Sequence, residues 1–500
     1  MKARSAKSPV KGLRDFRLFV LIIALFVAPV FIVFPQDYAF ESDDFGFGDT
    51  GAESSSGFAF KFSGELSAKL LFFLEGFKSS ELGNIVSGKF DFSASGKIVD
   101  GLISFSLHPD FSDFSADSLL SLNEAYLRFY AGPVDIEAGL RKLTWGRADS
   151  FGPLDVINPV DYSDLSAVGN PRDIKIARPM IHVNWNIGAF SKLEGVFVPW
   201  FAGHTFASTG RWAPAQMSAL PDQVRLSIID RVSGLYSGVV LNLVINAINA
   251  GFDSYEYNPE NLYPKTNTLQ YAQGGLRFST TLGGADLGAQ YYYGRLPRPA
   301  FAVDINDFID ALSPPVPLPI PGMEDIHFNI DFNPFHHIGI DYAQVLGGFN
   351  IRAEAGVNIT NDIKGSNGAV YNPHMVWSLG FDRDLVWGIN LNLQANGLIR
   401  LMYKNIGSDP LAETEAGAKL SSTRITAIIS KKFLQDKLEV RAAALWGIED
   451  RDFLITPGVS FTINDITAEL SAGIFGGNRA GELGQYRGNS YIKAAVTWSF

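Results

Sequence analysis

Two-residue alternation runs through the stretch Tyr491-Ile-Lys-Ala-Ala-Val-Thr-Trp-Ser-Phe500. Apolar side chains occupy one parity, from Ile492 to Phe500, whereas Lys493, Thr497 and Ser499 occupy the other. Successive side chains of a β-strand point to opposite faces, so this pattern predicts a strand with one apolar and one polar face. Such a strand suits the edge of a soluble sheet or the wall of a barrel with lipid outside and water inside.

The same alternation recurs along the chain from Phe58 onward. In the segment from Trp387 to Asn396, Ile389, Leu391 and Leu393 alternate with asparagine and glutamine. A helix cannot use this pattern, because a period of two scatters apolar groups around a turn of 3.6 residues. The recurring segments therefore predict an all-β protein.

Short and long connections alternate between these segments. Candidates for tight turns are Val99-Asp-Gly, Ala131-Gly-Pro-Val, Asn186-Ile-Gly, Leu282-Gly-Gly-Ala, Leu346-Gly-Gly, Asp382-Arg-Asp-Leu, Leu434-Gln-Asp-Lys and Ile463-Asn-Asp. Eight such turns join sixteen strands, and the first and last strands make eighteen, with sixteen and twenty as alternatives. The long connections are 146–176, 201–267, 295–326, 404–419 and 476–488. This asymmetry predicts a transmembrane antiparallel up-and-down β-barrel with short periplasmic turns and long extracellular loops.

The N-terminal region has the features of an export signal. Six basic residues between Lys2 and Arg17 precede an apolar run from Leu18 to Phe34. We expect a signal peptide over residues 1–36, although a transmembrane anchor would use the same run. Residues 37–56 are predicted to be a disordered periplasmic lead-in, and residues 57–500 the outer-membrane barrel. The chain has no cysteine, which excludes disulfides and thiolate chemistry.

Composition agrees with a barrel. Glycine occurs 49 times and phenylalanine 39 times, and only 19% of residues are charged. The formal net charge of −11 argues against a nucleic-acid partner.

The final strand ends on an aromatic residue, Phe500. It thereby resembles the C-terminal signature by which bacterial outer-membrane β-barrels are recognised for assembly. The resemblance implies localisation in the bacterial outer membrane. Outer-membrane lipid and the barrel-assembly machinery, which would bind Phe500, are the partners that it implies.

The most distinctive segment of the sequence lies between Leu143 and Tyr162. Its Trp-Gly pair and its Asn-Pro-x-Asp segment resemble the motif of a poorly characterised porin-like family of bacterial outer-membrane proteins, for which the resemblance implies an envelope channel of unassigned substrate. The motif residues are Trp145, Gly146, Arg147, Asn158, Pro159 and Asp161. Arg147 and Arg172, with Asp149, Asp155 and Asp161, are predicted to form an ion-pair net inside the pore. The motif would lock the loop or contact a solute.

Charged residues on the polar parity are predicted to line the pore. They are Lys61, Glu65, Lys69, Glu124, Arg128, Glu137, Arg141, Arg352, Glu354, Arg400, Arg424, Glu439 and Arg441. The two signs are nearly balanced, which predicts weak ion selectivity for a small-molecule solute.

Two long connections carry apolar residues. Residues 295–326 combine seven prolines with Phe301 and Phe308, which predicts a constriction loop folded inward or packed across the mouth. The stretch from Leu235 to Ala250 is a lid helix or an extra strand.

The leading interpretation is a porin-like outer-membrane channel for passive uptake or export of small solutes, constricted by inward-folded loops. The alternatives are a transporter of hydrophobic, fatty-acid-like molecules and a surface adhesin or scaffold barrel. We expect no enzyme, because the nearest catalytic candidates are a loop histidine, His204, and Asp222. Neither a metal site nor a cofactor is predicted.

Overall fold

The computed structural model describes residues 59–75, 86–108, 120–149, 152–167, 174–254, 263–312, 326–407, 411–412, 414–415 and 418–500. The predicted signal peptide and lead-in, residues 1–36 and 37–56, lie outside these described residues. Among the described residues, no helix has the length and apolar character needed to cross a bilayer.

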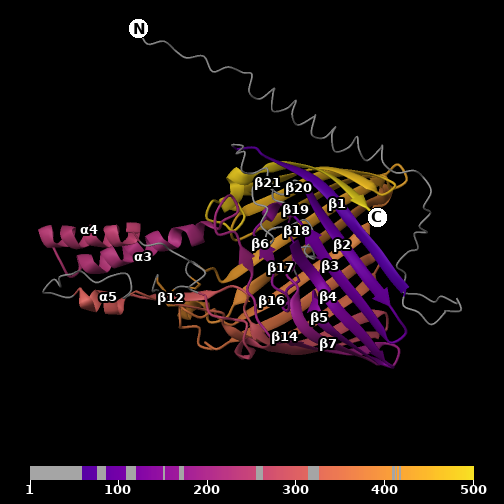
Figure 1. The fold of residues 1–500 in the computed structure, drawn as a ribbon, viewed down its shortest axis with the longest axis horizontal. Coiled ribbons are helices and arrows are strands. Elements are labelled where there is room, and N and C mark those ends of the chain that lie inside the picture. The colour runs from indigo at the N-terminus through magenta and orange to yellow at the C-terminus, as the bar shows by residue number, and fades with distance from the viewer. Residues whose placement is uncertain are drawn as a thin grey trace, which may run out of the picture. The chain divides into compact units, whose positions relative to one another are not determined.

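Eighteen antiparallel strands form one closed sheet, which confirms the predicted barrel and strand number (Figure 1). The strands are β1 (Ala59–Phe73), β2 (Val86–Ser95), β3 (Val99–Leu107), β4 (Leu120–Ala131), β5 (Val134–Arg141), β7 (Arg178–Ile187), β8 (Ser191–Val198), β10 (Gln273–Leu282), β11 (Ala285–Arg295), β14 (Pro334–Leu346), β15 (Phe349–Thr360), β16 (His374–Asp384), β17 (Ile389–Arg400), β18 (Ser421–Phe433), β19 (Leu438–Gly447), β20 (Asp452–Ile463), β21 (Ile466–Gly477) and β22 (Tyr491–Ser499). Each pairs with the next, and β22 pairs with β1.

Closure depends on a close approach between the first and last strands. The backbone N–H of Phe500 donates to the carbonyl of Gly64 at 3.0 Å, and the N–H of Gly64 donates back at 2.9 Å. A Cβ at Gly64 would lie 2.7 Å from the ring of Phe500. Glycine at this position therefore makes room for the aromatic ring at the seam.

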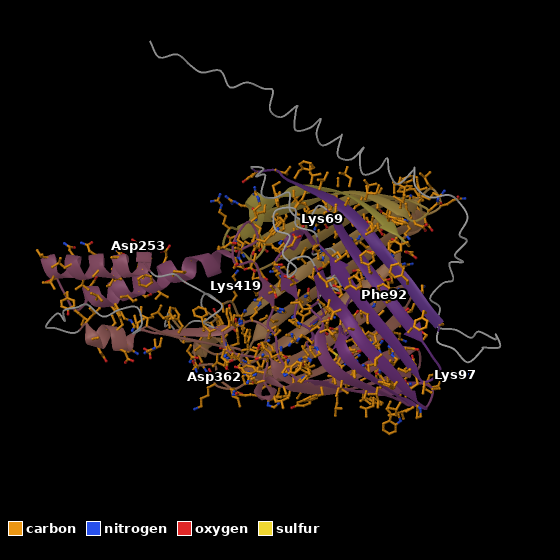
Figure 2. The ribbon with its side chains drawn as sticks, viewed as in Figure 1. Lys69, Phe92, Lys97, Asp253, Asp362 and Lys419 are labelled. Carbon is orange, nitrogen blue, oxygen red and sulfur yellow. The ribbon has the colours of Figure 1, made fainter. Side chains whose placement is uncertain are left out.

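Tight turns connect the strands at one end of the barrel. Gly283 and Gly284 have φ of +59° and +82°, the conformation that two-residue hairpin turns require and glycine adopts without strain. The turn after β2 comes slightly earlier than predicted, at residues 96–98, because Val99 already belongs to β3. Figure 2 shows Lys97 at this turn end, and Asp362 and Lys419 at the opposite end, where the long connections lie. We refer to that opposite end as the mouth.

The two parities of each strand have different surroundings. Phe60, Phe62 and Phe92 are 81%, 50% and 47% exposed on the outer face, as expected of side chains that face lipid. Leu393 shares this parity, whereas Asn392 points inward and donates to Asp149 Oδ2 at 2.8 Å. Neighbouring residues of a strand thus face opposite sides of the wall, one toward lipid and the other toward the lumen.

The connections at the mouth contain short elements. They are β6 (Asp161–Tyr162), η2 (Leu165–Ala167), β9 (Thr205–Phe206), α3 (Ala215–Ser233), α4 (Gly238–Ser254), η4 (Leu269–Tyr271), β12 (Ala300–Asp304), α5 (Asn306–Ala311), β13 (His327–Asp331), η7 (Tyr403–Asn405) and η8 (Gly484–Asn489); η6 (Val386–Gly388) lies at the turn end. The stretch Leu235 to Ala250 is helical from Gly238 onward, where α4 begins. Its apolar residues cannot join the barrel sheet, because β8 already pairs with β10.

Three connections build a separate hydrophobic core, which we name the lobe. It comprises α3, α4, α5, the hairpin β12–β13 and Leu411 (Figure 1). Phe308 is 2% exposed and packs there with Ile228 and Val244, and Phe301 packs against the same core. The prediction that these two phenylalanines constrict the lumen is therefore wrong, because both pack in the lobe. Helices from another connection supply the apolar partners that the loop needs.

Candidate functional site

The lumen contains a segment between β5 and β6, residues 142–160, which we name the inner segment. Residues 150 and 151 are not described. Trp145 is 1% exposed at its base, with its ring edge-on to Tyr292 at 6.3 Å. Leu143, Ile157 and Met180 complete this buried cluster. The tryptophan of the motif thus fixes the start of the segment to the inward faces of β7 and β11.

Asn158 holds the C-terminal end of the inner segment through hydrogen bonds to the backbone. Its side-chain N–H groups donate to the carbonyls of Arg141 at 3.1 Å and Ile176 at 2.9 Å, and its Oδ1 accepts from the N–H of Leu143 at 2.8 Å. The carbonyl of Pro159 accepts from Ile176 at 2.8 Å. These contacts satisfy loop backbone groups, as expected of a locking role for this residue.

Asp161 stabilises the turn that follows. Its Oδ1 accepts from the N–H of Ser163 at 2.9 Å, and its own N–H donates to the carbonyl of Ile174 at 2.7 Å. The aspartate therefore serves the local backbone, and no described cation pairs with it.

Glu354 of β15 holds the middle of the inner segment. Its carboxylate accepts backbone N–H groups from Arg147, Ala148 at 2.8 Å and Leu154 at 3.3 Å. Gly146 has φ +94°, and a Cβ there would collide with Glu354 Oε1. Glycine at this position is required both by the backbone conformation and by the close approach of the carboxylate.

Arg147 pairs with acids on the wall. Its Nε lies 2.7 Å from Asp341 Oδ1, and its guanidinium lies 3.3 Å from Asp286. Asp149 pairs at 2.6 Å with Arg352, which lies on β15 like Glu354. For Arg147 and Asp149 the prediction of pairing within the loop is wrong, because the wall supplies their partners.

Asp155 forms a buried ion pair with Lys175, which belongs to the same connection and not to a strand of the wall. Burial raises the pKa of the Asp155 carboxyl, and the charge of Lys175 opposes that rise. Lys175 also donates to Thr144 Oγ1 at 2.6 Å, which ties the two ends of the connection together. Arg172, the other predicted cation, lies outside the described residues.

Small residues on the wall make room for the inner segment. A Cβ at Gly339 would lie 2.5 Å from the side chain of Leu154, and one at Gly356 would lie 3.1 Å from it. Gln290 donates to the carbonyl of Leu154 at 2.7 Å. Leu154 is fully buried as a result. The covered wall therefore consists of β11, β14 and β15, with contributions from β16 and β17.

The pairing register places all the predicted pore-lining residues on the inward face, and some of them form clusters. Glu137, 1% exposed, contacts Arg128 at 2.5 Å, Arg141, and His182 at 2.7 Å.

Others contact the connections at the mouth. Lys69 lies 3.5 Å from Asp164, and Arg400 lies 2.5 Å from Glu415. Arg424 lies 2.6 Å from Glu482 in the last connection.

The opposite wall is more open. Lys61 and Glu65 of β1 point inward and are nevertheless exposed, and Glu439 and Arg441 of β19 are partly exposed. Glu124 of β4 accepts from the backbone of Lys142 at 2.9 Å. The lumen is thus covered from β7 to β17 and open to solvent along β18 to β22, β1 and β2. We name this second surface the hydrated wall.

The motif residues were found from sequence, but several wall residues were not. Asp341 and Gln290, which are both 4% exposed, escaped notice. The detectable signal was glycine on the inward parity at Gly339 and Gly356, where a strand wall lacks side chains because another segment lies against it.

Comparison with known proteins concerns architecture alone. No protein-family model matches the chain, and no curated protein matches it. Wzi, an outer-membrane protein of Escherichia coli involved in group 1 capsule assembly, is similar over 88% of this chain and 84% of its own, with 10% identity and a TM-score of 0.43.

Two structures from Acinetobacter baumannii show a similar degree of likeness. OccAB4 matches with 8% identity over 88% of this chain and 98% of its own, with a TM-score of 0.43. The outer-membrane channel DcaP matches with 10% identity over 90% and 99%, with a TM-score of 0.39. The barrel assignment itself rests on the strand pairing described above.

Proposed function

We propose that the protein is a passive diffusion channel of the bacterial outer membrane for small polar solutes, narrowed by the inner segment. The observation that carries the proposal is the set of contacts from Arg147, Asp149 and Leu154 to the inward faces of β11, β14, β15 and β17. A segment fixed in this way reduces the cross-section of an eighteen-stranded barrel, whose lumen is otherwise wide enough for water.

The path for solutes runs along the hydrated wall. Its cations are Lys61, Lys69, Lys89, Arg424, Lys432, Arg441 and Lys493, and its acids are Glu65, Asp91, Glu439 and Glu469, with Glu482 of the last connection beside Arg424. The small excess of cations favours weak selectivity for anions, with strong exclusion of neither sign.

The membrane orientation follows from the connections. We place the tight turns in the periplasm and the mouth, with its lobe, at the cell surface. Assembly would use the last strand, β22, and Phe500 directly after it, whose ring centre lies 5.4 Å from that of Phe62 and 6.3 Å from that of Phe90.

Single-channel recording in planar bilayers tests the proposal. Replacement of residues 147–154 by a short glycine-serine link should raise conductance, because the covered wall becomes accessible while Trp145 and Asn158 remain. Deletion of α3 and α4 should leave conductance unchanged and serves as the matched control. A protein that conducts no ions with or without the inner segment would contradict the channel.

The two other functions fare differently. A transporter of hydrophobic molecules would use the two apolar loops as its entry site, but Phe301 and Phe308 lie in the lobe core. An adhesin or scaffold gains support from Val239 and Leu243 of α4, which are 76% and 62% exposed. This role would be retained if the barrel proved not to conduct.

A further inference from the structure

A cluster of aromatic and charged side chains lies at the mouth, outside the contacts of the inner segment. We name it the mouth cluster: Tyr162 of β6, His204 and Phe206 at β9, Arg298, Arg424 and Glu482. The parallel pair β6–β9 sets Tyr162 beside Phe206. The N–H of His204 donates to the carbonyl of Pro297 at 2.9 Å, which brings Arg298 alongside.

The rings form a partly exposed platform. Tyr162 and Phe206 stack with centroids 5.5 Å apart and an angle of 20° between planes. His204 stands edge-on to Tyr162, at 5.3 Å and 79°. No hydrogen bond to the hydroxyl of Tyr162 is formed within the described part of the chain. The platform therefore offers an apolar face with a free hydroxyl at its rim.

Glu482 joins two arginines beside these rings. Its carboxylate lies 3.2 Å from Arg298 and 2.6 Å from Arg424. Although burial opposes the effect, the two guanidinium charges lower the pKa of Glu482 to about 2. Arg298 and Glu482 still expose 56% and 52% of their side chains. The group carries one net positive charge and keeps several N–H donors and carboxylate lone pairs in contact with solvent.

His204 adds a donor of fixed orientation. Its Nδ1 accepts the N–H of Val160 at 2.9 Å, so that Nε2 carries the hydrogen. Burial and the charge of Arg298 lower the pKa of His204 to about 3, which keeps the ring neutral. The other catalytic candidate, Asp222, pairs with Arg225 within α3 at 2.6 Å and, among the described residues, does not contact His204.

The cluster is assembled from widely separated parts of the barrel rim. Its members come from the connections β5–β7, β8–β10, β11–β14 and β21–β22 and from the inward face of β18. These segments meet only if they reach across the mouth. A solute that enters the lumen from this end passes the cluster.

We propose that the mouth cluster is a binding subsite for saccharides, and specifically for neutral pyranose rings. The inference rests on the proposed channel function only in assigning the sugar a route through the barrel. A pyranose presents an apolar C–H face that fits an aromatic platform, and its rim of hydroxyls both donates and accepts. The apolar face would pack on the rings of Tyr162 and Phe206. The hydroxyls would bond to the Arg298–Glu482 pair and to the N–H at His204 Nε2.

Other ligand classes fit less well. A purely apolar ligand would remove solvent from Arg298 and Glu482 without replacing the hydrogen bonds that they make to water. A multiply charged anion would meet a site of only one net positive charge. Among the described residues, no group of three or more potential metal ligands is gathered, and the mouth cluster has one carboxylate.

Isothermal titration calorimetry of the detergent-solubilised full chain tests the site without requiring conduction. The probes are maltotriose, lactose and N,N′-diacetylchitobiose, with a polyethylene glycol of similar mass as the control solute. At least one sugar should bind saturably, at about millimolar dissociation constants. Replacement of the platform by Y162A should weaken that binding about tenfold.

Matched variants separate binding from folding. Y403A removes a tyrosine of η7 that is 37% exposed and lies outside the cluster, and it should leave sugar affinity unchanged. The conservative Y162F should retain most of the affinity, because the stacking face remains. Each variant is first checked for the heat-dependent gel shift of a folded barrel.

The outcomes also distinguish this inference from the channel proposal. A barrel that binds sugar but does not conduct keeps the subsite and contradicts the channel. A barrel that conducts but binds none of the three sugars overturns the subsite alone. Equal loss of affinity in Y162A and Y403A would likewise refute the assignment.

Discussion

Glu354 is the wall residue that holds the middle of the inner segment, so its replacement by alanine should release that segment. The carboxylate is 3% exposed and accepts three backbone N–H groups. E354A leaves Gly146 and Arg147 in place but removes the acceptor. We expect the segment to open while the barrel remains folded, because its strand pairing does not use this side chain.

The magnitude follows from how far water can replace the lost acceptor. Leu154 is fully buried, so its unpaired N–H costs about 1–3 kcal/mol. Arg147 and Ala148 are partly exposed, and their N–H groups bond to water at a smaller cost. The sum is about 2–4 kcal/mol. At about 1.4 kcal/mol per factor of ten, the open fraction should rise by about thirtyfold to several hundredfold.

Hydrogen exchange read by mass spectrometry measures this opening in the peptide that spans residues 143–160. Exchange should accelerate in E354A, and single-channel records should show a larger or noisier conductance. E469A is the control, since Glu469 pairs with Lys493 at 2.9 Å on the hydrated wall. Unchanged exchange in E354A, or equal acceleration in E469A, would refute the role of Glu354.

Three further predictions concern topology, the lipid face and pH. A tag at Gly365 should be accessible on intact cells and one at Gly347 should not; labelling of Gly347 from outside would reverse the orientation. Leu393→Arg should cost about 2–4 kcal/mol in a bilayer refolding assay, whereas Asn392→Arg, one residue away, should be tolerated; equal costs would refute the parity. The pKa of His204 is about 3 in the folded protein against an ordinary 6.5, so its stabilising contribution is complete above pH 6.5 and declines as the pH falls from 6.5 to 3. Exchange of the amide bonded to its Nδ1, corrected for intrinsic rates, should rise over that window in the wild type and lose this dependence in H204N.

The barrel could be predicted from sequence because its signal is local. Each strand carries its own alternation, as from Ile389 to Asn396, and the turns at Gly283 and Gly347 need glycine for backbone reasons alone. Neither feature depends on a distant residue. The number and order of strands therefore followed from reading segments one at a time.

The destinations of the long connections could not be predicted in this way. Prolines and phenylalanines indicate that residues 295–326 pack against something, but the partners of Phe308 are Ile228 and Val244 in another connection. An apolar side chain does not specify which distant residues it packs against. The same loop composition suits the lumen and the lobe equally well.

The inner segment was recognised as distinctive, yet its contacts were assigned wrongly. Arg147 and Asp149 have opposite charges within one short loop, which made a local pair plausible. The structure instead pairs Arg147 with Asp341 and Asp149 with Arg352. Asp341 lies 194 residues beyond Arg147 in the chain, and Arg352 lies 203 residues beyond Asp149.

The seam between β1 and β22 sets the order in which this fold can be completed. Ser67 and Thr497 meet across it at 3.0 Å although 430 residues separate them. Contacts of such high separation form late, since the intervening chain must already be arranged. Until then, the growing sheet has two unpaired edges, each able to capture a strand of a neighbouring chain. Folding of this protein should therefore compete with aggregation until the moment of closure, and a catalyst of the process would act by shielding those two edges.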